Sequence, residues 1–138
     1  MLAGFGHAGA ILFAGLTALA ADREILRALK RPRLRAHALT RLQKAHLRVF
    51  IGLGCALLTG SLMLSAQLAT LPRSPFFWLK VAGLLALVWN GRRILKHERW
   101  LRSDPDNEVF WQAMRAPART SALLWCTIAL LGVLLTTV

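Results

Sequence analysis

The sequence predicts an all-α integral membrane protein, a single-domain four-helix bundle whose helices run in up-down order. Hydrophobic residues make up 56% of the 138 residues, and the mean hydropathy is +0.49. Four windows, at 1–21, 49–71, 76–94 and 120–138, each contain close to the ~20 residues that a helix needs to cross a bilayer. The charged residues within these windows are limited to Lys80, Arg92 and Arg93.

The cationic residues separate into two blocks, and this distribution predicts the topology. The chain has 18 Lys and Arg against six Asp and Glu, which gives a net charge of +12. Nine of these cations lie between Arg23 and Arg48, and seven lie between Arg92 and Arg119. Because basic loops are retained in the cytoplasm, we expect both blocks on that side and both termini on the periplasmic or outer side. Anionic membrane lipids are the expected partners of these blocks, and nucleic acid is not.

The first window has two interpretations. Ala18, Leu19 and Ala20 resemble the cleavage site of a secretory signal peptide. The window lacks a basic leading segment and its apolar run is long, so we expect a retained span that continues to Pro32. Beyond Pro32, apolar residues recur every three or four positions among Arg and Lys, which predicts a basic amphipathic segment near the headgroups or a solvated basic extension. These residues are Leu34, Ala38, Leu42 and Ala45.

The two remaining connections contain helix-capping residues. A proline-bounded turn at 70–75 precedes the third span, with Ser74 as the N-cap and Pro75 at the first helical position. Three carboxylates at 104–108 suggest a metal loop, but no glycine allows the tight turn that such a loop needs. We therefore expect Ser103 or Asp106 to cap a short interfacial helix that runs through Trp111. Pro117 is then expected to precede the last span.

The aromatic residues and cysteines of the spans receive structural interpretations. An interfacial aromatic belt is expected from Phe76, Phe77, Trp78, Trp100 and Trp111. Cys55 and Cys126 lie within spans, where we expect them to be small packing residues rather than a disulfide or a metal site.

Lys80 is a cation within an apolar segment in a chain whose acidic residues all lie outside the four windows. A lysine ammonium without a carboxylate costs several kcal/mol in hydrocarbon, and less if it reaches the headgroups. Lys80 therefore either extends to the interface, loses its proton, or binds an anion that the chain does not supply. The last alternative predicts a ligand site.

His7 is expected at the same depth as Lys80. Each residue lies within about 10 Å of the outer end of its span, at ~1.5 Å per residue. Small residues spaced by four allow close helix approach or leave room for a flat ligand. These residues are Gly6, Ala10, Ala14 and Ala18 in the first span and Gly52, Ala56 and Gly60 in the second. A haem or other anionic ligand would use imidazole as an iron ligand and the ammonium as a partner for a propionate or as a second ligand.

The other three histidines lie in the basic blocks. His46 and His97 are at the inner ends of the second and third spans, a bilayer thickness from His7. A second haem between them is one alternative, and headgroup-level histidines are the other. His37 has no partner that the sequence identifies.

Five segments carry a resemblance to a known superfamily. They are His7, Phe13–Leu16, Thr59–Leu62, Ser74–Lys80 and the basic tail Arg92–Lys96. The pattern resembles the superfamily of small four-helix bacterial membrane proteins that includes the HemJ-type protoporphyrinogen oxidases. It is most similar to an uncharacterised sister family in which a Pro-Phe-x-x-Lys segment begins the third helix.

The resemblance implies haem b, with His7 as the metal ligand and both His7 and Lys80 as cofactor-binding and catalytic residues. It also implies a location in the bacterial inner membrane. In HemJ-type enzymes, a stretch with proline, arginine and tyrosine follows the Ala-Gly-Leu step, whereas this chain has Thr17–Arg23 there. The resemblance therefore implies haem binding more directly than oxidase activity.

Two functions follow from these expectations. The first is a haem-binding membrane oxidoreductase that passes electrons from a porphyrin or another donor to quinone. The second is a non-catalytic accessory or scaffold subunit of a larger membrane complex, or a homo-oligomer, in which the small-residue strips bind partner helices. The sequence contains no Ser-His-Asp arrangement, no phosphate-binding loop and no Cys-His zinc spacing.

Overall fold

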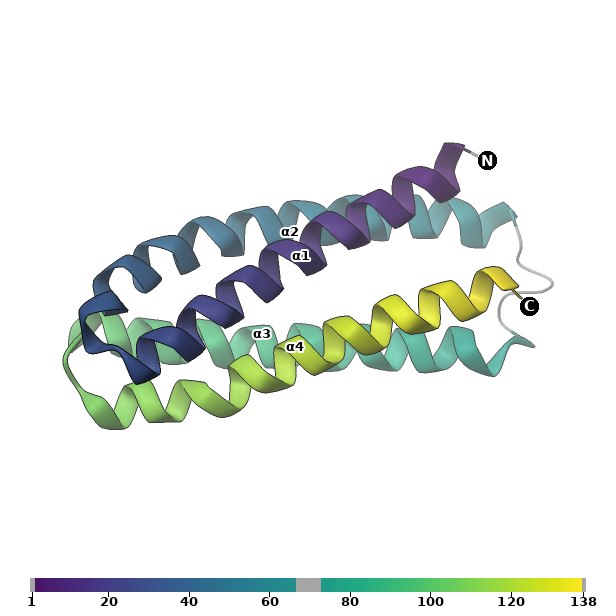
Figure 1. Cartoon of the computed structure of the whole chain (residues 1–138). Coiled ribbons are helices and arrows are strands. Elements are labelled where there is room, and N and C mark those ends of the chain that lie inside the picture. The colour runs from purple at the N-terminus through teal and green to yellow at the C-terminus, as the bar shows by residue number, and fades with distance from the viewer. Residues whose placement is uncertain (1, 67–72, 138) are drawn as a thin grey trace.

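The computed structural model describes residues 2–66 and 73–137, which form four long α-helices and one short 3-10 turn. The elements are α1 (Leu2–Lys30), η1 (Pro32–Leu34), α2 (Arg35–Ala66), α3 (Pro75–Ser103) and α4 (Glu108–Thr137). The helices alternate in direction, so the start of α1 and the end of α4 lie at one end of the bundle (Figure 1). We call this the terminus end, and we call the opposite end, which carries η1 and the α3–α4 connection, the basic end. The all-α, up-down prediction is confirmed for the described residues.

The ends of the helices follow local chain chemistry. Pro32, which cannot continue α1, begins η1. Ser74 is the extended N-cap residue of α3 and Pro75 is at the first helical position, as predicted. The rest of the predicted 70–75 turn lies largely outside the described residues. The prediction for α4 was wrong, because Asn107 rather than Ser103 or Asp106 caps it: its Oδ1 accepts a hydrogen bond from the Val109 N–H at 3.1 Å.

Pro117 lies inside α4 and does not separate two helices, which corrects the sequence prediction. Proline removes one backbone donor and perturbs the preceding turn, so a helix through it needs support from its neighbours. Asn90 of α3 provides a contact at this position, since its Nδ2 donates a hydrogen bond of 2.8 Å to the Pro117 carbonyl. Both residues are buried, and α4 is therefore continuous.

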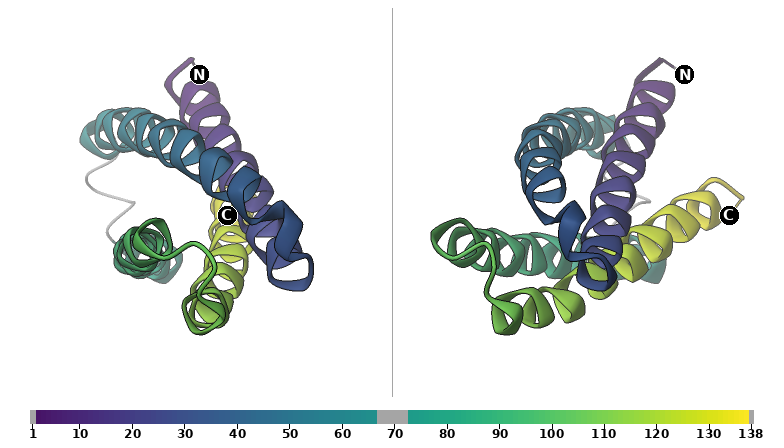
Figure 2. Two further views of the ribbon diagram at one scale, coloured as in Figure 1. Left: turned by 90° about the vertical axis from the view of Figure 1, so that its left-hand side faces the viewer. Right: turned by 60° about the vertical axis from the view of Figure 1, so that its left-hand side comes forward.

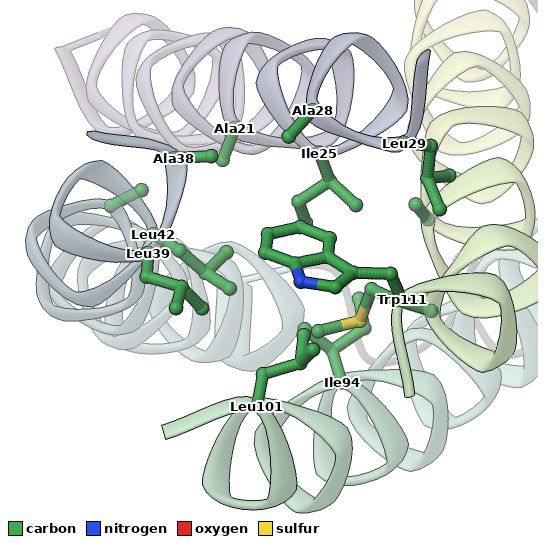
Figure 3. Packing of buried hydrophobic residues seen from close by; sticks show 13 residues of the cluster. Ala21, Ile25, Ala28, Leu29, Ala38, Leu39, Leu42, Ile94, Leu101 and Trp111 are labelled. Atoms are coloured by element: carbon green, nitrogen blue, oxygen red, sulfur yellow. The ribbon is translucent and has the colours of Figure 1, made fainter. Parts of the chain in front are cut away.

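The larger hydrophobic core lies at the basic end and is centred on Trp111. Figure 3 shows its indole between Ile25 of α1, Leu42 of α2 and Leu101 of α3. The indole N–H donates a 2.8 Å hydrogen bond to the carbonyl of Pro105, and the residue is only 1% exposed. The prediction that Trp111 belongs to an interfacial belt was wrong. Its position on α4 directs it inward, which sequence spacing alone did not reveal.

Helices α1 and α2 pack closely along their small-residue strips, as predicted. A Cβ atom added to Gly52 would lie 2.7 Å from the Cβ of Ala14, closer than side chains allow. Helices α3 and α4 also pack together, and α1 contacts α4, whereas α2 and α3 make the least contact of the neighbouring pairs. The views along the bundle in Figure 2 show this separation of α2 from α3.

The outer surface of the bundle is apolar. Large side chains exposed on it include Phe5, Leu16, Leu58, Leu62, Leu85, Trp89 and Leu123. The segments Gly4–Lys30 and Pro32–Ala66 are long and apolar enough to cross a membrane, and most of each apolar window is not buried inside the bundle. Cys55 and Cys126 are free thiols that also lie on this exposed surface. An exterior of this kind is typical of a surface covered by lipid or by partner helices.

Candidate functional site

His7 lies in α1 near the terminus end, and α2 fixes the orientation of its imidazole. The Nδ1 atom is 2.9 Å from the Ala56 carbonyl oxygen and 3.2 Å from Thr59 Oγ1. A carbonyl only accepts, so Nδ1 carries the proton and donates it. The Thr59 hydroxyl donates to the Cys55 carbonyl at 2.7 Å, which leaves its oxygen free to accept from His7. In this tautomer, the lone pair of the ring is on Nε2.

Lys80 of α3 contacts the Nε2 atom of His7 from the opposite side of the bundle. Its Nζ is 3.4 Å from His7 Nε2, and Nζ is the donor because a neutral imidazole nitrogen without hydrogen can only accept. The contact joins α1 to α3, two helices that are not neighbours in chain order. The structure thus brings the two predicted site residues together, and His7 supplies a polar partner for Lys80.

Glycines surround the His7–Lys80 pair. A Cβ atom at Gly60 would lie 3.1 Å from His7 Cε1, and one at Gly132 would lie 3.8 Å from Lys80 Nζ. Beside His7, an apolar cavity of about 70 Å³ extends past Ile11 and Leu84. A cavity of this size holds only a few water molecules.

The donor set limits which metal species this site can hold. Among residues 2–66 and 73–137, no three His, Cys, Asp or Glu side chains gather as ligands for a metal ion. A site with three or four protein ligands, as zinc requires, is therefore not formed by these residues. A porphyrin carries its own four nitrogen ligands, so one or two axial side chains are sufficient for its iron.

His46 belongs to an ionic cluster at the basic end. Its Nδ1 is 2.8 Å from Glu98 Oε2, while Arg102 contacts Glu98 Oε1 at 2.6 Å through one nitrogen and 3.0 Å through another. Arg102 also donates to the Leu39 carbonyl at 3.3 Å. Burial opposes ionisation of Glu98, but the hydrogen bonds from His46 and Arg102 outweigh it and hold the Glu98 pKa below its ordinary value. The cluster ties α2 to α3 at this end.

His97 and His37 do not join His46. His97 Nδ1 donates to the Arg93 carbonyl at 2.6 Å, and its ring contacts Trp100 edge-on. His37 is exposed. His46 and His97 therefore have separate partners and do not contact each other in the described part of the chain.

Arg35 forms a second charged contact at the basic end. The residue is 7% exposed, its guanidinium lies 5.2 Å from the Trp111 ring centroid, and it pairs with Glu108. The pairing joins the start of α2 to the start of α4. The hydrogen bonds from Arg35 and Gln112 hold the pKa of Glu108 below its ordinary value.

Asp22 is a buried polar residue that the sequence analysis missed. It directly follows the predicted first span, yet it is only 4% exposed and its Oδ2 has no hydrogen-bond partner. Helical spacing indicates its position, because Asp22 is four residues after the buried Ala18 and three before the buried Ile25. Asp22 therefore lies outside the apolar windows in the sequence but inside the bundle in the structure.

No protein-family model, curated protein or solved structure matches the chain.

Proposed function

We propose that this protein is a four-span membrane protein of the bacterial inner membrane with both termini outside. The two helices that meet the length and hydropathy criterion support this placement, as does the apolar exterior of the bundle. Sixteen of the 18 Lys and Arg lie in the two sequence blocks of the basic end, the exceptions being Arg73 and Lys80. In this orientation the basic end faces the cytoplasm.

We further propose that His7 and Lys80 hold haem b and that the protein is a membrane oxidoreductase. The observation that carries this proposal is the contact between His7 Nε2 and Lys80 Nζ. The Nδ1–H of His7 is bound to a backbone carbonyl, an arrangement that fixes the tautomer and ring orientation of metal-ligating histidines. Haem would supply one-electron redox chemistry at this site. The resemblance to HemJ-type proteins supports the same two residues, with a porphyrin or another donor and quinone as redox partners.

His7 would hold the iron through Nε2, and Lys80 would pair with a propionate or serve as a second ligand in place of their present hydrogen bond. The cavity beside His7, at about 70 Å³, is smaller than a porphyrin, so haem binding requires the helices to separate. The α2–α3 side, where packing is sparse, is the route that disturbs the fewest contacts.

An absorption spectrum of protein purified from haem-replete cells tests the proposal. We expect a Soret band in the wild type, its loss in His7→Ala, and a shifted or weakened band in Lys80→Met. His37→Ala is the matched control, because His37 is exposed in the basic block, and its spectrum should equal that of the wild type. A colourless wild-type protein, or a Soret band unchanged in His7→Ala, would contradict haem ligation at this site.

The alternative function is an accessory subunit of a membrane complex. Its support is that the His7–Lys80 hydrogen bond gives both side chains a polar partner without any ligand. In that case a haem-free protein co-purifies with stoichiometric partners, and His7→Ala does not change the yield of the complex.

A further inference from the structure

A cavity of about 320 Å³ lies among all four helices toward the basic end. Its volume is at the lower end of the range for ligand sites, roughly 300–1,000 Å³. Its walls are largely apolar and include Leu53 of α2 and Trp125 of α4. The exposed residues of its lining, Phe50, Val88 and Arg92, all belong to α2 and α3. The cavity therefore opens on the side where these two helices make the least contact.

The Asp22 carboxyl group lines this cavity from α1. Its Oδ2 is buried without a hydrogen-bond donor, although Ser121 of α4 is a hydrogen-bond partner of the carboxyl group and His46 of α2 lines the same cavity. Within residues 2–66 and 73–137, no Lys, Arg or His nitrogen lies within 4.0 Å of Asp22 to form a salt bridge. Burying a carboxyl oxygen without a hydrogen-bond donor costs free energy. A ligand with N–H groups would supply the donor that the chain does not provide.

The lining of the cavity carries one carboxyl group and two basic side chains. Asp22 is buried, and burial raises its pKa to about 7, while His46 is half-buried and Arg92 is exposed. Asp22 follows the first predicted span directly, and Arg92 lies at the end of the apolar part of the third. In the proposed topology, Asp22 and Arg92 are at the depth of the cytoplasmic headgroups, and the apolar walls nearer the terminus end face the acyl chains.

We propose that this cavity binds an amphiphile with a primary ammonium and a phosphate, namely phosphatidylethanolamine of the cytoplasmic leaflet. The ammonium donates to Asp22 Oδ2, the phosphate pairs with Arg92, and an acyl chain leaves between α2 and α3 along Phe50 and Val88. The Trp125 side chain in the wall adds an aromatic group near the cation. Phosphatidylcholine has no N–H donor, and phosphatidylglycerol offers hydroxyl donors but no cation, so neither gives Asp22 a charge-assisted hydrogen bond. This inference rests on the membrane embedding and orientation proposed above, and it is independent of haem.

Native mass spectrometry of delipidated protein in detergent tests the proposal with the three phospholipids at equal acyl composition. We expect the wild type to bind phosphatidylethanolamine roughly tenfold more tightly than the other two, the effect of one charge-assisted hydrogen bond. Asp22→Asn should abolish the preference, whereas Arg92→Gln should weaken the binding of all three lipids. Asp106→Asn, in the exposed α3–α4 connection, is the matched control and should retain the preference.

A second variant fills the cavity without removing a charge. Gly91 lines the cavity, and a Cβ atom added there would meet no other atom within 4 Å. The Gly91→Leu side chain therefore has room to fill part of the cavity, and the variant should also bind phosphatidylethanolamine less tightly. Gly54→Leu is its control, because Gly54 has the same open surroundings and is not among the cavity residues. Equal binding of the three lipids by the wild type would overturn the proposal. A preference that persists in both Asp22→Asn and Gly91→Leu would also overturn it.

The outcomes separate this inference from the proposed function. A Soret band with no lipid preference would overturn the lipid site alone. A colourless protein that prefers phosphatidylethanolamine would overturn haem binding alone. Recovery of the protein from the soluble fraction would contradict the membrane embedding on which both depend.

Discussion

The polar side chains at the two ends of the bundle differ in how many internal partners they have. At the basic end, Glu98 has partners on both carboxylate oxygens, and Arg35 is held between Trp111 and Glu108. At the terminus end, His7 of α1 donates to the Ala56 carbonyl of α2 and accepts from Lys80 of α3. At the basic end, charged residues connect the helices around the Trp111 core. At the terminus end, the imidazole lone pair of His7 accepts a hydrogen bond from the Lys80 amine.

This difference separates residues that stabilise the fold from residues that are available to a ligand. A charge with two or three internal partners is costly to remove and has little capacity for a ligand. A histidine whose second nitrogen meets only an amine can exchange that contact for a metal without losing its link to the backbone. We therefore expect substitutions at the basic end to lower stability and substitutions at the His7–Lys80 site to change ligand binding.

The largest expected effect on stability is at the centre of the basic-end core. Trp111→Ala should lower the free energy of unfolding by about 3–5 kcal/mol, because it empties the cluster and leaves the Pro105 carbonyl without its donor. Trp89→Ala removes an indole that is 68% exposed and should cost about 0.5 kcal/mol or less. Thermal unfolding in one detergent measures both. Equal losses in the two variants would mean that the basic end is not the stable end.

An intermediate effect is expected where α1 and α2 approach most closely. Gly52→Ala should cost about 1–3 kcal/mol, since the new methyl group meets Ala14 and the backbone of Ala10. Gly54→Ala, two residues away, meets nothing within 4 Å and should be neutral or stabilising by about 0.5–1 kcal/mol. The pair is compared by the midpoint of denaturant unfolding. A neutral Gly52→Ala would show that the two helices can move apart freely.

The smallest expected effect is the pH dependence that Glu98 contributes. Its pKa in the folded protein lies below the ordinary value of 4.5, so the ionised carboxylate stabilises the fold. This stabilisation is fully present above the unfolded-state pKa and is lost as the pH falls through the folded-state pKa. Between about pH 6 and about pH 3.5, the unfolding temperature should therefore fall less in Glu98→Gln than in the wild type.

Asp106→Asn is the control for this measurement, because Asp106 is exposed in the connection between α3 and α4. Its acid dependence should follow that of the wild type. If Glu98→Gln had the same acid dependence as well, the cluster with His46 and Arg102 would not be the source of the pH effect.

Hydropathy and small-residue spacing predicted much of this architecture. Apolar windows and charge blocks gave the number of helices and their alternation, and the Gly52 strip gave the close contact of α1 with α2. Helical rise placed His7 and Lys80 at one depth, and the structure brings them into contact. The roles assigned to these two residues remain predictions, because depth and contact do not identify a ligand.

The features that were predicted incorrectly depend on which way a side chain faces. Trp111 and Asp22 both lie next to polar sequence, so Trp111 was assigned to the interface and Asp22 received no assignment. The structure buries both, because long helices continue the bundle beyond the apolar windows. Pro117 was misjudged for a related reason, since its tolerance depends on a contact with Asn90 that the sequence does not reveal.

The sparse contact between α2 and α3 has a consequence for assembly. The strongest packing is between consecutive helices, α1 with α2 and α3 with α4, so each hairpin forms from contacts that are local in the chain. Local contacts form early because little chain entropy is lost in closing them. Docking of α1 against α4 then joins the two hairpins, and the α2–α3 seam is the last and weakest closure. The seam that closes last is therefore also the one that reopens at the lowest cost when a lipid or haem enters the folded bundle.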